Sequence, residues 1–385
     1  MPCRYASVNN PSCVRVKVRF RNYLAVKLSA MFNKLTVIEL SSVLAGPAVG
    51  MFFAEMGARV VKIEYKHSGG DITRTWKLPE ESPEGLSAYY CSVNWQKETL
   101  FIDYLISEER NRVYELIEKA DVVITNFKLG DDIKFDMDYA TLHQLNPRLI
   151  YGQITAFGQE SDRVGFDVVL QAESGFMYMN GTPQSGPLKM PVALIDLLAA
   201  HQLKQGILAA LWQREQTGKG CLVHVSLFDA AVSALANQAT NWLMCGHIPQ
   251  PIGSLHPNIA PYGELFTCAD GKSIVLAIGS DKQFAALCQV LNMPELPKDE
   301  RFKINALRVK NRIALQAVLE QAFNQFPLRE VLLGELISQQ VPAGAIRNLS
   351  EVFALPEAQA LILTELTPTG QLTQRVKTAV FELKD

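Results

Sequence analysis

Short apolar runs alternate with longer segments of helical periodicity along the first half of the chain. The runs occupy residues 35–40, 59–64, 99–103, 121–126 and 148–154. Runs of this length, bounded by turn residues, are typical of buried strands. The segments at 48–57 and 107–120 have the spacing of helices, and the first of them ends at a glycine. Strands that alternate with helices predict an α/β fold with a parallel sheet and right-handed crossovers.

The pattern changes in the second half. An apolar segment at 194–213 predicts a buried helix, and a strand at 222–225 leads into a helix predicted from Leu227 to about Met244. Residues 246–261 are rich in proline and glycine, which predicts a linker. A hairpin and three helices follow, at 262–268, 273–278, 280–291, 311–326 and 328–339. Two strands joined by a tight turn and followed by helices predict a smaller α+β domain.

The composition excludes several classes of protein. With 385 residues, of which 48% are hydrophobic, the chain is long enough for two domains with buried cores. The net charge of −2 gives no basic excess for nucleic acid, and no apolar run approaches the roughly 20 residues of a membrane-spanning helix. Seven cysteines without a CxxC pair favour reduced thiols in an intracellular protein. The dispersed histidines include no HExxH, so we expect no metal site.

The stretch from Gly165 to Gly175 holds the main candidate for chemistry. Gly165 supplies a turn, and Asp167 stands where a helix begins. One interpretation is a helix cap, because an Asp oxygen accepts the free N–H groups of a first turn. The other is a nucleophilic carboxylate, desolvated by Phe166 and Val168, that attacks a carbonyl carbon. The local residues leave both interpretations open.

Several motifs in order resemble class III (formyl-CoA transferase-like) CoA-transferases. The Gly-aromatic-Asp segment at 165–167 looks like the family's nucleophile signature, and 42–47 looks like its first phosphate-side loop. Further similar segments lie at 57–64, 193–197, 214–220, 225–229 and 256–262. The resemblance covers roughly residues 33 to 365, and several ordered motifs are far more specific than one.

The resemblance implies a CoA-transferase that moves CoA from an acyl-CoA thioester to a free carboxylic acid. Asp167 would carry first an acyl anhydride and then a CoA thioester. Such intermediates hydrolyse unless water is excluded, for which Phe166, Phe176 and Met177 are suited. Coenzyme A is thus expected as part of a substrate, with no permanently bound cofactor. Asp196 is interpreted as a cap or hydrogen-bond anchor, although related racemases use an Asp at this position in acid–base chemistry.

The resemblance also implies which residues contact the substrates. Residues expected to hold CoA are Val43, Leu44, Ala45, Tyr65, Ile102, Asn126, Phe127 and Lys134. Those expected near the acyl group are Phe166, Gly253 and His256. The residues leave Lys134 open as a phosphate contact or a solvated surface lysine, and His256 as an acyl contact or a loop histidine.

The chain also departs from the family pattern. Tyr65 stands where some relatives have an Arg, and Thr155 and Leu105 stand where a cation occurs. The family's glycine run is absent around Gly253. The loop at 67–71 predicts an ordinary surface turn. Because CoA is polyanionic, fewer cations would weaken phosphate binding or move it to other residues.

Two alternatives share the same scaffold. An α-methylacyl-CoA racemase carries a His directly before the Asp, and Phe166 occupies that position here and cannot accept a proton. A non-catalytic acyl-CoA-binding relative is the second alternative, and the intact Asp167 argues against it.

The expected organisation follows from pattern and resemblance together. We expect a Rossmann-like, CoA-binding large domain at 33–220, a linker and small domain at 221–330, and a return segment to the large domain at 331–385. The family also implies an interlocked homodimer. Residues 1–32 are basic and contain no acidic residue, which indicates upstream translation before a start at Met31 or an organelle-targeting segment. We favour Met31 as the start and a cytoplasmic location, with an organelle matrix as the alternative.

Overall fold

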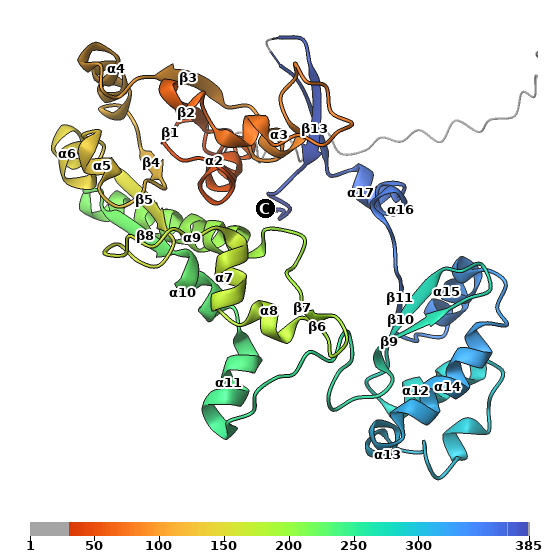
Figure 1. The fold of residues 1–385 in the computed structure, drawn as a ribbon. Helices are drawn as coiled ribbons and strands as arrows, with labels where there is room; N and C mark the ends of the chain where they lie inside the picture. Colours follow the sequence, from red (N-terminus) through yellow and green to blue (C-terminus); the bar gives the residue numbers. More distant parts are fainter. Residues whose placement is uncertain (1–30, 368, 384–385) are drawn as a thin grey trace, which may run out of the picture.

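A six-stranded parallel sheet organises the first part of the computed structural model, which describes residues 31–367 and 369–383 (Figure 1). The spatial order is β3-β2-β1-β4-β5-β8, and all neighbours are parallel. The strands are Thr36–Glu39 (β1), Arg59–Tyr65 (β2), Glu98–Ile102 (β3), Val122–Thr125 (β4), Ile150–Thr155 (β5) and Leu222–Ser226 (β8). The predicted α/β fold with a parallel sheet is confirmed, and this strand order is consistent with a Rossmann-like domain. Apart from Met31 and Phe32, the expected N-terminal extension lies outside the described residues.

Helices cover both faces of this sheet, because successive strand residues point to opposite sides. Val37 belongs to the core on one face and Ile38 to the core on the other, and Val122 and Val123 divide in the same way. Helices α2 (Ala45–Glu55), α9 (Leu194–Thr217) and α10 (Leu227–Ser233) close the first core, and α4 (Ser107–Ile117) and α6 (Tyr139–Leu145) close the second. Burial on both faces explains why β1, β2, β4 and β5 read as continuous apolar runs, whereas the edge strand β3 is largely exposed.

The single helix predicted from Leu227 to about Met244 is wrong, because the structure has two helices there. Helix α10 ends at Ser233, and α11 spans Ala236–Cys245. Ala236 has a φ of +48°, in the left-handed region, so the right-handed helix cannot continue through it. Helix α10 buries three residues, whereas α11 buries none and leaves the core.

Short elements complete the first part of the chain and connect its long ones. They are α3 (Ala88–Val93), α5 (Asp131–Lys134), α7 (Asp167–Glu173), α8 (Phe176–Met179), β6 (Gly181–Thr182) and β7 (Gly186–Pro187). Helix α7 packs against α9 and α10, which places the start of α7 beside the start of α9.

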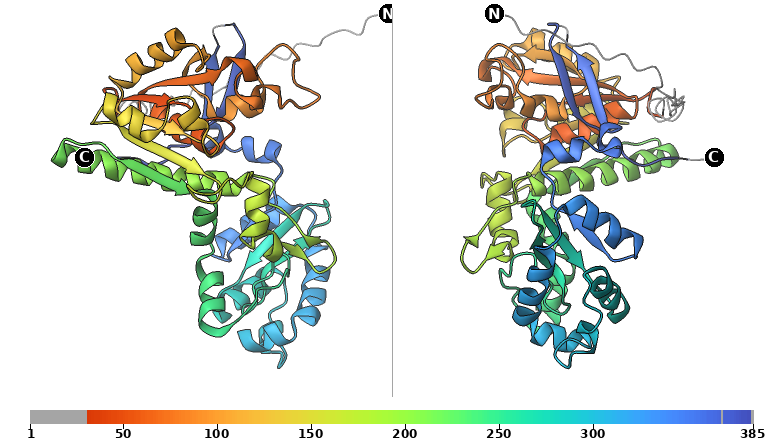
Figure 2. Two further views of the ribbon diagram at one scale, coloured as in Figure 1. Left: turned by 60° about the vertical axis from the view of Figure 1, so that its left-hand side comes forward. Right: turned by 90° about the vertical axis from the view of Figure 1, so that its right-hand side faces the viewer.

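A separate core lies in the second part of the chain, below the first in Figure 2. Its antiparallel sheet contains β9 (Tyr262–Thr267), β10 (Ser273–Ala277) and β11 (Ala343–Ala345). The accompanying helices are α12 (Asp281–Val290), α13 (Asn305–Lys310), α14 (Arg312–Phe323) and α15 (Arg329–Ser338). The domain boundary expected at residue 331 falls inside α15, which packs in this second core. The domain boundary expected at residue 220 falls just before β8, which belongs to the parallel sheet.

The C-terminal segment returns to the first core. Helices α16 (Leu349–Phe353) and α17 (Pro356–Gln359) lead to a hairpin of β12 (Ile362–Leu366) and β13 (Leu372–Val376), and β13 packs against α3 (Figure 1). The Glu55 carboxylate then accepts hydrogen bonds from the backbone N–H groups of Thr378, at 2.9 and 3.0 Å, and Ala379, at 2.6 Å. Because Ala379 is also buried in the first core, the C-terminal segment is held against the end of α2.

The helices found in residues 31–367 and 369–383 include none with the length and apolar character needed to cross a membrane.

Candidate active site

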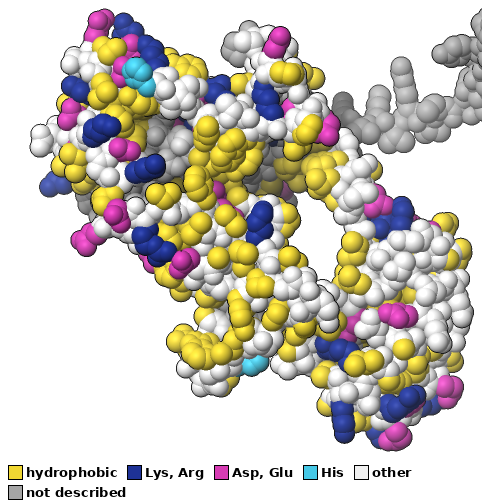
Figure 3. Space-filling model, viewed as in Figure 1, with side chains coloured by type: hydrophobic (Ala, Val, Ile, Leu, Met, Phe, Trp, Pro, Cys, Tyr) yellow, Lys and Arg dark blue, Asp and Glu magenta, His cyan; other side chains and the backbone are white. Residues whose placement is uncertain are grey.

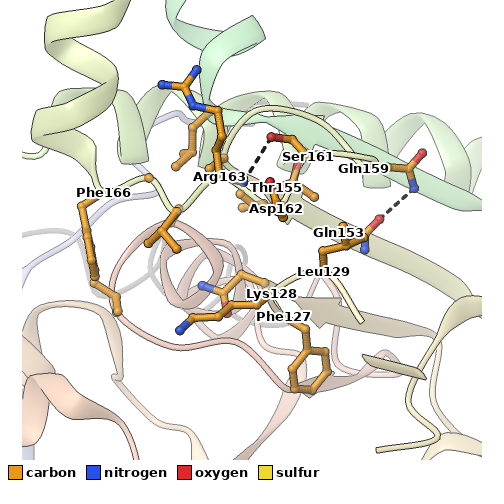
Figure 4. Close-up of a pocket in the computed structure, with 18 of the residues that line it drawn as sticks. Phe127, Lys128, Leu129, Gln153, Thr155, Gln159, Ser161, Asp162, Arg163 and Phe166 are labelled. Carbon is orange, nitrogen blue, oxygen red and sulfur yellow. Dashed lines mark hydrogen bonds between the residues drawn. The ribbon is translucent and has the colours of Figure 1, made fainter. Parts of the chain in front are cut away.

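A cavity of about 660 Å³ opens at the carboxyl ends of β1, β4 and β5 (Figure 4). Its walls come from the loop after β1, the loop after β4, the loop after β5 and the segment that enters α7. Strands β1 and β4 are neighbours, and the chain leaves them toward opposite sides of the sheet. Ligands of open α/β sheets bind at this kind of switch point, so the cavity lies where the fold favours a ligand.

The loop after β1 is held at two consecutive residues. The Asn126 side chain accepts a hydrogen bond from the Ser42 N–H at 3.0 Å and donates one to the Ser42 carbonyl at 2.8 Å. The Val43 N–H donates to both oxygens of Asp71, at 3.2 and 3.3 Å. Val43 has a φ of +72°, which is rare for a β-branched residue. The loop is therefore constrained from two sides where it lines the cavity.

A buried charge network lies directly beneath this loop. Lys62 Nζ is 2.9 Å from Glu39 Oε1 and 3.1 Å from Asp71 Oδ2, and it donates to the Ser41 carbonyl at 2.8 Å. Lys97 Nζ pairs with the other Glu39 oxygen at 2.7 Å. Burial works to raise the pKa of Asp71, but the Lys62 charge and hydrogen bonds from Thr73 outweigh it and lower that pKa. Asp71 is only 3% exposed, so the turn expected at 67–71 ends in a buried carboxylate instead of lying wholly on the surface.

Asp167 is the first residue of α7, but its carboxylate does not cap that helix. Oδ1 accepts hydrogen bonds from the backbone N–H groups of Ile195 at 2.7 Å and Asp196 at 3.3 Å. Oδ2 accepts one from Gln171 Nε2 at 2.5 Å. The carboxylate thus lies at the N-terminus of α9, which has 24 residues and a partial positive charge at that end. This arrangement stabilises an anion next to the cavity wall at Phe166.

The backbone approach at Gly165 fixes the position of this carboxylate. A Cβ added to Gly165 would lie 2.7 Å from Leu170 Cδ2 and 2.8 Å from Ala156 Cβ. Both distances are too short for real Cβ contacts, so the Gly165 backbone packs closely on the loop after β5. The glycine before Phe166 and Asp167 is therefore required for packing as well as for a turn.

Asp196 contributes a second carboxyl group to the cavity. It is the third residue of α9, is 8% exposed and lines the cavity, and within the described chain its side chain has no hydrogen-bond partner. Burial, with a further contribution from the Asp167 charge, raises the pKa of Asp196 to about 7. The expected anchoring role belongs to its backbone N–H, which binds Asp167.

Six of the residues expected at the site do line the cavity. They are Val43, Leu44, Ala45, Asn126, Phe127 and Phe166. Tyr65, Ile102 and Lys134 lie outside its lining. The Tyr65 ring stacks on Tyr104, Ile102 is buried in the core, and the exposed Lys134 has its Nζ 5.1 Å from the centroid of the Phe135 ring.

Gly253 and His256 lie in the segment that leads to the second core, away from this cavity lining. The Gly253 N–H donates to the Gly181 carbonyl at 2.7 Å. The His256 N–H donates to the Tyr262 carbonyl at 2.9 Å, and its ring makes an edge contact with the Tyr262 ring. The single chain therefore does not bring either residue to the cavity.

Three residues near the cavity were missed in the sequence analysis. Lys128 and Arg163 are cations in its lining, and Figure 4 shows Lys128 beside Phe127 on one wall while the Arg163 guanidinium points away from that wall. Lys128 directly follows the Asn126-Phe127 strand exit, which is a usable signal. Tyr89 has no such signal. Tyr89 lies outside the cavity lining, and burial, followed by the charges of Asp196, Asp167 and Asp71, raises its pKa to about 12.

Comparison with known proteins defines the class of this protein. The model described as CoA-transferase family III matches residues 32–385. The chain belongs to CoA-transferase family III, which confirms the resemblance drawn from its motifs, and it is a class III CoA-transferase.

Individual relatives agree over most of the chain. A succinate–glutarate CoA-transferase of Agrobacterium fabrum is 39% identical over 333 residues, which cover 85% of this chain and 82% of that protein. A succinyl-CoA:glutarate CoA-transferase of Homo sapiens is 34% identical, over 83% and 73%. The crystal structure of a CAIB/BAIF family protein from Brucella suis has a TM-score of 0.81 at 40% identity, covering 90% of this chain and 91% of that one.

Proposed function

We propose that this enzyme moves CoA from an acyl-CoA thioester to a free carboxylic acid through covalent intermediates on Asp167. The observation that carries the proposal is the position of the Asp167 carboxylate, on the N-terminal N–H groups of α9 and next to the cavity wall at Phe166. Family membership gives the reaction class, and this position supports the nucleophile.

The proposed reaction needs no net proton transfer. An Asp167 oxygen attacks the thioester carbon, the C–S bond breaks, and CoA leaves as a thiolate, which gives an acyl-aspartyl anhydride. The thiolate attacks the aspartyl carbonyl, the donor acid leaves, and Asp167 carries a CoA thioester. The acceptor carboxylate then attacks this thioester and forms a second anhydride with release of the thiolate. Attack of the thiolate on the acyl carbon releases the new acyl-CoA and restores Asp167.

The same N–H groups that hold the carboxylate suit its acylated forms. The Ile195 and Asp196 N–H groups point at Asp167 Oδ1, where negative charge develops when a thiolate attacks the aspartyl carbonyl. Gln171 fixes the other oxygen, and its own Oε1 accepts from the Met190 N–H at 2.8 Å. We therefore assign these three donors to the stabilisation of charge at Asp167.

CoA is proposed as a substrate that occupies the cavity. The six expected residues that line it provide a mainly apolar wall, and Lys128 supplies the positive charge for which Lys134 was considered. Within the described chain the Lys128 side chain has no hydrogen bond or ion pair, so its charge is free for an anionic ligand. The named activities of the relatives support small dicarboxylates, such as succinate and glutarate, as the acids.

We also propose a large domain, a small domain and a return segment, assembled as an interlocked homodimer. The small domain would correspond to the second core, up to β11, and the return segment to the chain from α16 onward. Phe166 is 54% exposed, so the single chain does not exclude water from Asp167. The space-filling view has an opening between the two parts of the chain, and apolar side chains cover α11 (Figure 3). A second copy passing through the opening would cover such surfaces.

The reduced cysteines of the described chain support an intracellular, cytoplasmic enzyme.

Covalent trapping tests the nucleophile. The enzyme is mixed with succinyl-CoA, treated with hydroxylamine, and its peptides are examined by mass spectrometry. We expect modification of the peptide that contains Asp167, and its absence in Asp167→Asn. Transfer to glutarate should fall by about 10⁴-fold or more in this variant, since loss of a nucleophile has effects of this order in other acyl transfer.

Asp162→Asn is the matched control, because Asp162 is a carboxylate in the cavity lining and Asp167 directly follows the lining residue Phe166. It should keep the label on Asp167. Label that persists in Asp167→Asn, or exchange of the α-proton without any adduct, would reject the proposed mechanism.

A further inference from the structure

Val43 combines a strained backbone with a position in the cavity wall. A β-branched residue with a φ of +72° is a genuine outlier, and such strain persists only where the surroundings enforce it. A contact at Val43 itself that opposes relaxation is the hydrogen bond from its N–H to the two Asp71 oxygens. Release of this contact would favour a φ below zero and would move Ser42 and Leu44, which line the cavity on either side.

Asp71 is itself held in place by groups that do not touch the cavity. Its carboxylate pairs with Lys62 at 3.1 Å and accepts from the Thr73 N–H at 3.1 Å and from Thr73 Oγ1 at 2.8 Å. Its backbone N–H donates to Glu64 Oε2 at 2.8 Å. Asp71 is thus a rigid, charged acceptor that comes from the loop after β2 and reaches the loop after β1.

We propose that Asp71 is a positioning residue, which holds Val43 in its left-handed conformation and so keeps the loop after β1 open to CoA. This inference rests on the proposed binding of CoA in the cavity, but not on the covalent role of Asp167. If only a fraction of the molecules have the loop conformation that binds CoA, the apparent dissociation constant for CoA rises by the inverse of that fraction. Asp71 therefore acts on affinity for CoA through the backbone of Val43 without touching the ligand.

The test measures the equilibrium affinity of the full-length enzyme for free CoA by calorimetry. We expect Asp71→Asn to weaken CoA binding by about 10- to 100-fold, as release of strain of this kind predicts. Val43→Gly alone is the reference for the double variant, because it removes the Val43 side chain from the cavity wall while Asp71 still holds the loop. The double variant Val43→Gly/Asp71→Asn should bind within about threefold of Val43→Gly, because glycine adopts positive φ without strain and no longer needs Asp71.

Recovery in the double variant separates this role from a merely structural one. The inference would be overturned if Asp71→Asn binds CoA with unchanged affinity. It would also be overturned if the weaker CoA binding of Asp71→Asn persists when residue 43 is glycine. If Asp71→Asn does not fold, Thr73→Val removes one donor to Asp71 and leaves the Lys62 pair in place. It should weaken CoA binding in the same direction and recover with Val43→Gly, and failure to do so counts against the inference.

Measurements of CoA binding and of the covalent adduct together distinguish failure of this inference from failure of the proposed function. CoA binding that follows the pattern above without any adduct on Asp167 would reject the covalent mechanism alone. Wild-type enzyme that does not bind CoA would reject both the proposed function and this inference.

Discussion

Asp167 is in a different chemical environment from its neighbour Asp196, although both lie at the start of α9. The Asp167 carboxylate accepts two backbone hydrogen bonds and one from a side chain. Within the described chain the Asp196 carboxyl accepts none, and it lies buried beside that anion. At this helix end the Asp167 carboxylate is thus held by three hydrogen-bond donors, whereas burial and the Asp167 charge raise the pKa of Asp196.

The raised pKa of Asp196 predicts a specific dependence of stability on pH. An Asp with a pKa of 3.8 when unfolded and about 7 when folded stabilises the fold fully below about pH 4, and this contribution is lost as the pH rises through 7. Asp196→Asn cannot ionise. Between pH 5 and 8 the wild type should therefore lose about 2 to 4 kcal/mol more unfolding free energy than the variant, since one pKa unit equals 1.36 kcal/mol.

Denaturant unfolding of both proteins at each pH measures this difference. Asp229→Asn is the control, because Asp229 holds the corresponding third position of α10 but is exposed. It should change the difference in stability between pH 5 and pH 8 much less than Asp196→Asn does. Parallel curves for the wild type and Asp196→Asn would contradict the assignment of a high pKa to Asp196.

At the level of residues, the sequence singled out Asp167 and six of the cavity residues, but not the groups that bind the Asp167 carboxylate. Gly165-Phe166-Asp167 is a local pattern and could be recognised. The donors to Asp167 come from Ile195 and Asp196, 28 and 29 positions later, and only the packing of α7 on α9 brings them near. The helix-cap interpretation correctly predicted that the Asp167 carboxylate accepts N–H groups of a first helical turn. That turn belongs to α9, however, and not to α7, where Asp167 itself lies.

Strand β2 carries two ion pairs that differ in burial. Lys62 is fully buried between Glu39 and Asp71, whereas Arg59 pairs with Glu98 on the surface, with side chains 52% and 54% exposed. Lys62→Met should destabilise the enzyme by about 3 to 5 kcal/mol, because it leaves the buried Asp71 carboxylate without its cation and leaves Glu39 with Lys97 alone. Arg59→Met also replaces a cation of β2 by methionine, and it should cost less than about 1 kcal/mol of unfolding free energy.

Urea unfolding monitored by circular dichroism gives both values. Equal effects at the two positions would show that burial of the Lys62 network does not set its importance. Added salt provides a second comparison, since it should weaken the exposed pair more than the buried one.

Among the elements, buried strands were predicted best and helix ends least well. Strands covered on both faces consist of continuous apolar residues and stand out in the sequence. The break between α10 and α11 depends on one left-handed residue, Ala236, and alanine gives no signal for such a backbone. The same is true of Val43, whose conformation depends on Asp71, 28 residues away.

On the scale of the whole molecule, the exposed apolar surface of α11 is the clearest sign of an assembly. Trp242, Leu243 and Met244 are 53%, 79% and 82% exposed. If α11 is an interface of the proposed homodimer, Leu243→Glu should shift the enzyme toward monomer, because a charge would be buried there. Light scattering after size-exclusion chromatography measures the mass.

Leu105→Glu is the control for this experiment. Leu105 is 56% exposed in the loop after β3, at the far side of the parallel sheet from α11. It should leave the mass unchanged. A Leu243→Glu enzyme with the mass and activity of the wild type would place the interface elsewhere.

The contact of Glu55 with Thr378 and Ala379 has a consequence for the lifetime of any assembly. It joins residues 323 and 324 positions apart, so that the intervening chain forms a loop closed without a covalent bond. A second chain threaded through such a loop could leave only after this contact opened. Exchange of subunits between two differently labelled populations would then follow the rate at which the C-terminal segment detaches, and dilution alone would not separate the pair.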